Sequence, residues 1–166
     1  MLSIDLGRLA RDGTAEIEAA VPADDPLWTD TDLRPGGALE VRVQAQQAGD
    51  DVVVRGRFRG TLEMECRRCL TPLEVPVEGE LSLLYRPPDA EAYEDAYVLP
   101  ARGAELDLGE ALWEHLLLVA PRFPLCREDC KGLCPRCGKD LNEGPCGCAV
   151  EEADERWAPL RELKGD

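Results

Sequence analysis

Aromatic side chains are scarce in this sequence, at 5% of the residues, although hydrophobic residues make up 44%. A core must therefore be built mainly from valine, leucine and alanine. The chain has one histidine, His115, which we do not assign to a metal, and no Ser/His/Asp or paired-carboxylate constellation stands out. No apolar run approaches the roughly 18–20 residues of a membrane span, and the longest, Leu116–Ala120, suits a buried helix. The sequence thus favours neither an enzyme nor a membrane protein.

Basic residues are outnumbered, because 19 lysines and arginines face 34 aspartates and glutamates, for a formal charge of −15. This balance disfavours non-specific binding to nucleic-acid phosphates and favours basic protein partners, although acidity also serves solubility alone. The residues that follow Met1 contain neither the basic stretch nor the apolar stretch of a secretory signal. We therefore expect a cytoplasmic protein in a reducing compartment.

What the sequence does contain is cysteine in four close pairs. Structural zinc takes four soft ligands at about 2.3 Å, and two closely spaced cysteines can offer both sulfurs to one ion. Four pairs make two complete ligand sets, so we expect two structural zinc ions. Gly138, after the third pair, permits a left-handed turn whose N–H groups can point at the sulfurs. The pairs are Cys66 with Cys69, Cys126 with Cys130, Cys134 with Cys137, and Cys146 with Cys148.

Two other interpretations of the cysteines stay open. A disulfide framework fits the even count, but disulfides are rare in a reducing compartment. Cys146 is also too close to Cys148 for an ordinary disulfide between the two. A redox switch that holds zinc only when reduced needs exposed thiols of low pKa, which a sequence does not show. Structural zinc is the favoured interpretation.

Three consecutive segments, residues 39–45, 52–66 and 73–85, alternate apolar and polar side chains with a period of two. This pattern predicts an antiparallel β meander with one solvent-exposed face. The pair Cys66 and Cys69 falls at the tip of the second hairpin, where a metal knuckle would replace a tight turn. The predicted fold class is α+β, with an antiparallel, barrel-like β sheet, one main helix and a C-terminal, cysteine-rich zinc lobe.

An arginine stripe lies on the exposed face of the second segment. It suits either an RNA-binding patch or a ladder of ion pairs to neighbouring strands. Pairing inward residues with inward residues places glutamates opposite these arginines, so we favour the ladder and keep RNA contact as the alternative. The stripe consists of Arg55, Arg57 and Arg59, with Glu80 and Arg42 predicted opposite Arg57, and Glu78 and Glu40 opposite Arg59.

The rest of the sequence completes a β domain, a lobe and a tail. Short strands are expected over Leu2–Leu6 and Ala15–Val21, which flank a turn, and over Ala96–Leu99. Asp107 can cap a helix over about residues 108–120. The expected parts are 1–120 (β domain with the helix), 121–150 (zinc-binding lobe) and 151–166 (a tail that docks on the core through Trp157, Leu160 and Leu163). The alternative for the tail is that it is disordered or binds a partner.

Four pairs can form two sites in three ways. Loop-closure entropy grows slowly with loop length and does not decide between them. The linker from Gly138 to Pro145 contains Asn142 and Gly144, and it can turn the last pair back onto the third. We therefore prefer one site of Cys66, Cys69, Cys126 and Cys130, and a second of Cys134, Cys137, Cys146 and Cys148.

The cysteine segments resemble those of the DUF177/YceD family, the large ribosomal RNA subunit accumulation proteins. The resemblance implies a role in large-subunit assembly or in 23S rRNA accumulation. It also implies that the second cysteine set is separable, because some members lack it. The motifs that carry it are Met64–Leu70, Pro124–Gly138 with Asp140–Asn142, and Trp157–Leu163, within a resemblance that extends from about Leu39 to Leu163.

The cysteine pattern predicts a zinc-stabilised, non-enzymatic protein, and the resemblance implies that it is a factor that binds the large ribosomal subunit precursor or a basic ribosomal protein. One alternative is an rRNA-processing enzyme or its accessory subunit, although four-cysteine sites leave no open position for a zinc-bound water. The other alternative is a zinc-thiolate redox sensor. Direct nucleic-acid binding is disfavoured by the overall charge.

Overall fold

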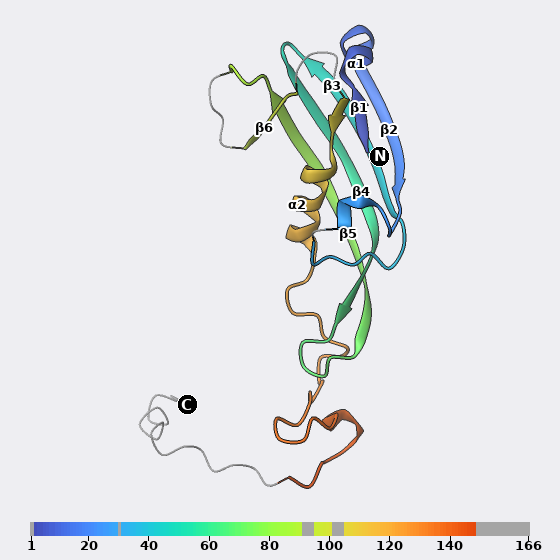
Figure 1. The fold of residues 1–166 in the computed structure, drawn as a ribbon, viewed down its shortest axis with the longest axis vertical. Helices are drawn as coiled ribbons and strands as arrows, with labels where there is room; N and C mark the ends of the chain where they lie inside the picture. Colours follow the sequence, from blue (N-terminus) through green and yellow to red (C-terminus); the bar gives the residue numbers. More distant parts are fainter. Residues whose placement is uncertain (1, 30, 91–94, 101–104, 149–166) are drawn as a thin grey trace, which may run out of the picture.

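The structure, a computed structural model, describes residues 2–29, 31–90, 95–100 and 105–148. These residues form an α+β fold with a five-stranded sheet, a two-stranded sheet and two α-helices. The molecule is elongated, with the cysteine-bearing segments at one end (Figure 1). The fold class is therefore as predicted. The division into three parts stays a prediction, and the docking expected for Trp157, Leu160 and Leu163 lies outside the described residues.

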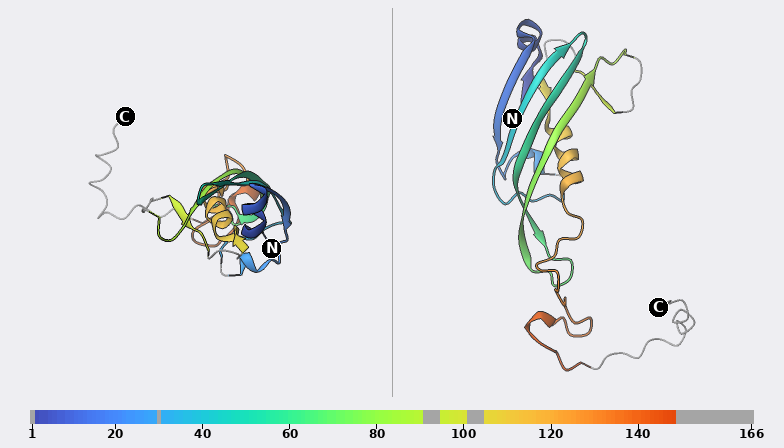
Figure 2. Two further views of the ribbon diagram at one scale, coloured as in Figure 1. Left: turned by 90° about the horizontal axis from the view of Figure 1, so that it is seen from above. Right: turned by 180° about the vertical axis from the view of Figure 1, so that it is seen from behind.

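The larger sheet is an antiparallel meander of four strands to which one parallel strand is added. Its order is β2-β3-β4-β5-β6, and β6 runs parallel to β5. Seen from above, the sheet curves around helix α2 (Figure 2). The strands are β2 (Thr14–Val21), β3 (Leu39–Ala48), β4 (Asp51–Glu65), β5 (Pro72–Arg86) and β6 (Ala96–Val98).

The predicted alternation and register are both confirmed. Along β4, Val54 and Phe58 are buried and the arginines between and beside them are exposed. This follows from the period-two geometry of a strand whose one face packs on a core. The cross-strand partners are Arg57 with Glu80, Arg59 with Glu78, Glu40 with Arg59, and Arg42 with Arg57.

The ion-pair ladder forms only in part. Arg59 Nη2 lies 2.7 Å from Glu40 Oε2, across the β3–β4 pair. Among the residues that the structure describes, no ion pair joins Arg55 or Arg57 to a carboxylate. Arg57 lies opposite Arg42 on β3 and opposite Glu80 on β5, but its side chain forms no ion pair with Glu80. The register prediction was right, but residues that are paired across two strands do not all bring their charged groups into contact.

Helix α2 (Gly109–Val119) covers the concave face of the sheet (Figure 2) and buries Leu112 and Leu116. The predicted cap is nearly right, because Asp107 Oδ1 accepts a hydrogen bond from Gly109 N at 2.8 Å while Leu108 holds the N-cap position. No helix among the described residues is long and apolar enough to cross a membrane. The buried sheet residues that complete the core include Val41, Val43, Val52, Val54, Phe58, Leu81 and Leu83.

The N-terminal region differs from the prediction. Strand β1 spans only Ser3–Asp5, and it pairs with β7 (Glu105–Asp107), which was not predicted. Where a turn was expected, Leu6–Asp12 form helix α1, capped by the Asp5 side chain. This helix buries one residue completely, Leu9, so its hydrophobic periodicity was too weak to recognise.

The β4–β5 hairpin projects beyond the rest of the sheet (Figure 1). Its two strands have 15 residues each, against 10 in β3. Beyond the end of β3, Pro35 forms an isolated antiparallel bridge with Leu62 of β4. The tip of this hairpin carries the first cysteine pair, as predicted, and so sets it apart from the core.

Candidate metal centres

The structure brings the eight cysteines into two groups of four, each of which could hold a metal ion. Within each group, the four Sγ atoms all lie within 4.8 Å of one another. All eight are free thiols, so the disulfide framework considered above is not formed. The first group is Cys66, Cys69, Cys126 and Cys130, and the second is Cys134, Cys137, Cys146 and Cys148, which is the grouping preferred from the sequence.

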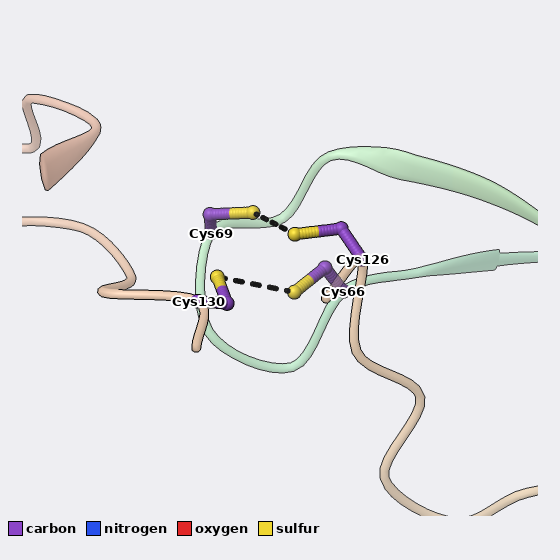
Figure 3. A group of neighbouring side chains, drawn as sticks. All are labelled: Cys66, Cys69, Cys126 and Cys130. Carbon is purple, nitrogen blue, oxygen red and sulfur yellow. Dashed lines mark hydrogen bonds between the residues drawn. The ribbon is translucent and has the colours of Figure 1, made fainter. Parts of the chain in front are cut away.

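Sulfur separations in the first group suit tetrahedral zinc (Figure 3). Cys66 Sγ lies 3.8 Å from Cys130 Sγ, and Cys69 Sγ lies 3.6 Å from Cys126 Sγ. A tetrahedron with metal–sulfur bonds of about 2.3 Å has edges of about 3.8 Å. The four thiols therefore fit zinc in both chemistry and spacing.

The hairpin tip forms a knuckle around the first two thiols. Leu70 N donates to Cys66 O, and Cys66 N donates to Thr71 O, each at 2.9 Å. Leu70 takes a left-handed conformation, with φ of 59°, at the position that a glycine fills in the third pair. The Thr71 hydroxyl also lies 3.1 Å from Cys69 Sγ. The turn thus closes without glycine, at the cost of a strained leucine.

The later chain is fastened to the hairpin by backbone bonds as well as by the thiols. Arg67 N donates to Pro124 O at 2.9 Å, and Leu133 N donates to Arg68 O at 3.1 Å. The Arg68 side chain in turn donates to Cys130 O at 2.8 Å. These contacts span both sides of the first group, so the group is held in place by two segments about 60 residues apart.

The second group is built locally. Gly138 N donates to Cys134 O at 2.9 Å, and Cys134 N donates to Lys139 O at 2.8 Å. Gly138 has a φ of 73°, the left-handed turn that the sequence predicted. In contrast to the mostly buried first group, Cys137 and Cys148 are exposed. This lobe therefore depends on its own short segment and on little of the core.

Asn142, from the segment between the cysteines of the second group, contacts the first group, which was not predicted. Its Nδ2 donates to Cys130 Sγ at 3.4 Å, and its Oδ1 accepts from Lys131 N at 2.8 Å. The turn that presents it, Leu141–Glu143, is capped by the Asp140 side chain. An amide that donates to a metal-binding sulfur orients that ligand and disperses its charge. Only the three-dimensional position of Asn142 reveals this role.

The thiols within a group differ in acidity. Burial raises the pKa of Cys66, but the N–H groups of Cys126, Cys69 and Arg68 outweigh it and lower the pKa to about 6. Hydrogen bonds from the N–H groups of Cys137 and Arg136 likewise lower the pKa of Cys134 to about 6.

Two other thiols, one in each group, have a raised pKa. Burial, together with hydrogen bonding to the other three thiols, raises the pKa of Cys126 to about 12. The neighbouring thiols of Cys137 and Cys146, followed by burial, raise the pKa of Cys148 to about 12. Four thiolates at these distances repel one another, so a divalent cation is what would let each group ionise completely.

His115 lies in neither group. Its Nδ1 is 2.9 Å from Ala111 O, one turn earlier on α2. This placement agrees with leaving His115 unassigned.

Comparison with known proteins shows a match to one protein family. The family model described as "Large ribosomal RNA subunit accumulation protein YceD" matches residues 54–164. That range begins in β4 and takes in β5, α2 and both cysteine groups.

Several relatives share a similar sequence identity with the chain but cover different lengths of it. Uncharacterized proteins of Mycobacterium tuberculosis (strain ATCC 25618 / H37Rv) and Mycobacterium bovis are 31% identical over 170 residues, covering 99% of this chain and 82% of theirs. The Arabidopsis thaliana protein named "Large ribosomal RNA subunit accumulation protein YCED homolog 1, chloroplastic" is 32% identical over 72 residues, covering 43% of this chain and 22% of its own. No solved structure matches the chain.

Proposed function

The chain belongs to the YceD family of large ribosomal RNA subunit accumulation proteins, and from this premise we propose that it is a non-enzymatic factor in large-subunit assembly and 23S rRNA accumulation. The observation that carries the proposal is the family match, which includes the hairpin and both cysteine groups. The factor acts in the cytoplasm by binding a large-subunit precursor or a basic ribosomal protein.

Two structural zinc ions complete this proposal. Cys66, Cys69, Cys126 and Cys130 would hold one, and Cys134, Cys137, Cys146 and Cys148 the other. The sulfur separations of 3.6 and 3.8 Å support zinc in the first group. Bound zinc would supply cross-linking of distant segments, because all four positions of each site are taken by cysteine and none is left for a reacting water. The protein's own residues would then supply the surfaces that bind.

The charge of the chain supports a basic partner. A formal charge of −15 attracts cationic proteins over a Debye length of about 8–10 Å. The exposed face of the sheet carries part of this charge, on Glu40, Glu78 and Glu80. Association of this kind weakens as salt rises, which gives the proposal a measurable signature.

Sedimentation tests the proposal. A tagged full-length chain should migrate with large-subunit precursors in a sucrose gradient at low salt and leave them at high salt. Cells depleted of the protein should lose 23S rRNA relative to 16S rRNA. A chain that stays at the top of the gradient at low salt, with unchanged rRNA levels after depletion, would contradict the assembly role. Cleavage of precursor rRNA by the purified, zinc-loaded protein would replace it with the processing enzyme.

A further inference from the structure

Charge is distributed unevenly along the chain. The hairpin tip and the cysteine lobe, residues 66–71 and 120–148, contain seven lysines and arginines and four aspartates and glutamates, a formal charge of +3. All other residues together carry −18. Figure 1 shows that these two segments lie together at one end of the elongated molecule. Basic side chains are thus concentrated where the cysteine groups are.

Zinc binding reduces this contrast without removing it. Two zinc ions on eight thiolates would add −4, which leaves this end at −1 against −18 for the rest. In the first group most of the sulfur charge is enclosed, since Cys66, Cys69 and Cys130 are buried and Cys126 is exposed. The arginines around it are exposed, Arg67 and Arg122 among them. Of these two parts of the chain, this end is therefore the one that a polyanion approaches against the weaker repulsion.

An exposed aromatic side chain lies among these cations. Phe123 is 78% exposed, and no other aromatic is among the exposed large hydrophobic residues that the structure describes. Arg122 precedes it, and Arg67 Nε donates to Arg122 O at 3.4 Å. The bond from Arg67 N to Pro124 O fixes the backbone on the other side of Phe123. A large ring is thus exposed to water next to Arg122 in the sequence, on a backbone that two hydrogen bonds hold to Arg67.

Cations combined with an exposed aromatic ring are what single-stranded nucleic-acid sites are made of, since bases stack on the ring while cations contact the phosphates. The arginine stripe on the sheet has no such composition. Arg59 is paired with Glu40, and Glu78 and Glu80 lie on the same exposed face. Repulsion by these carboxylates makes the stripe a poor phosphate site. The chemistry therefore favours the hairpin tip over the face that the sequence suggested.

We propose that Arg67, Arg122 and Phe123, the tip surface, bind single-stranded RNA, with a base stacked on Phe123 and phosphates on the two arginines. The choice of RNA rests on the proposed function in ribosome assembly, and the surface itself rests on charge and exposure. The acidic remainder of the molecule repels RNA, so only the tip end faces the strand.

Fluorescence anisotropy with the full-length, zinc-loaded chain tests the proposal. The probe is a fluorescein-labelled single-stranded RNA of about 12 nucleotides. Phe123→Ala should weaken binding about tenfold or more, and Phe123→Trp should restore it. Arg122→Ala should lower the slope of log K against log salt by about 0.7. Because Phe123 and Arg122 are exposed, these variants should keep two zinc ions and the wild-type unfolding temperature.

Two matched controls separate this surface from general effects. Leu118 on α2 is also 78% exposed, so Leu118→Ala removes an equally exposed apolar side chain and should leave RNA affinity unchanged. A combined Arg55→Ala and Arg57→Ala variant removes two cations from the sheet face and should also leave it unchanged. Equal loss in either control and in Phe123→Ala would overturn the tip surface.

The outcomes distinguish this inference from the proposed function. Wild-type protein that sediments with large-subunit precursors but binds no RNA, while Phe123→Ala releases it from them, would make the tip a protein-binding surface. The assembly role would then stand and the RNA inference would fail. Conversely, RNA binding that depends on Phe123 in a protein that never sediments with precursors would support the RNA site and contradict the assembly role.

Discussion

Asn142 Nδ2 donates a hydrogen bond to Cys130 Sγ at 3.4 Å, although Asn142 lies in the segment that closes the second cysteine group and Cys130 belongs to the first. The same amide accepts a bond from Lys131 N. A side chain from the segment between the cysteines of the second group therefore contacts a sulfur of the first. Occupation of the second site should influence the first, even though the sequence resemblance implied that the second set is separable.

Replacing Asn142 tests this connection. Asn142→Ala removes both bonds and a third, from Nδ2 to Asp140 Oδ1 at 2.7 Å. Loss of such an outer partner should weaken zinc binding at the first site about 10- to 100-fold. Asn142→Asp keeps the acceptor for Lys131 N but removes the donor to the Cys130 sulfur and to Asp140 Oδ1. Competition with a chromophoric chelator measures the affinity. If Asn142→Asp binds zinc as tightly as the wild type, the amide–sulfur bond is without effect.

Removal of cysteine pairs should separate the roles of the two groups. Cys66→Ser with Cys69→Ser should leave one zinc ion per chain and loosen the β4–β5 hairpin, because a structural zinc contributes on the order of 10 kcal/mol to folding. Cys146→Ser with Cys148→Ser should also leave one ion but keep the sheet intact, because the second group is local. Metal analysis and hydrogen exchange of β4 and β5 make the comparison. Equal loosening of the hairpin in both variants would contradict the division.

Gly132 should resist substitution by any residue with a side chain. Its φ is 73°, and a Cβ there would lie 2.9 Å from Arg68 O, the atom that accepts the bond from Leu133 N. Gly132→Ala should therefore lower the free energy of unfolding by about 1–3 kcal/mol. Gly37→Ala is the control, since a Cβ there meets nothing within 4 Å. Chemical denaturation of the two variants should show a loss only at Gly132.

The arginine stripe should give effects of different size at neighbouring positions. Arg59→Thr removes the pair with Glu40 and should cost at most about 1 kcal/mol, since both side chains are more than half exposed. Arg57→Thr removes a cation that lies between Arg42 on one strand and Glu80 on the other, so it should change the free energy of unfolding by less than Arg59→Thr does. Denaturation at low and high salt measures both. A loss at Arg57 as large as that at Arg59 would show that the ion pair with Glu40 contributes nothing of its own.

The strands were predictable because a period of two is strong over long segments. In β4, 15 residues alternate, and a shift of one residue would place the arginines in the core. That constraint is enough to identify the cross-strand partners of Arg57 and Arg59 from the alternation alone. It determines positions along the strands and not the directions of long side chains, so it could not show that Arg57 and Glu80 form no ion pair.

Short elements and long-range contacts were not predictable in the same way. Helix α1 has 7 residues, and β1 and β7 have 3 each, too few for a period to show. The cysteine groups followed from spacing, since close pairs can share a metal. Asn142 carries no such local signal, because its partner Cys130 is 12 residues away and is reached only through the fold.

The first cysteine group also orders events during synthesis. Cys69 leaves the ribosome 61 residues before Cys130. At typical rates of elongation, the hairpin tip is present for about 3–12 s with two thiols and no partners. The nascent chain can therefore form its sheet early, but the clip at the tip closes only after α2 and the segment beyond it have been made. A factor that binds the thiols of Cys66 and Cys69 could therefore act only before Cys130 has been made.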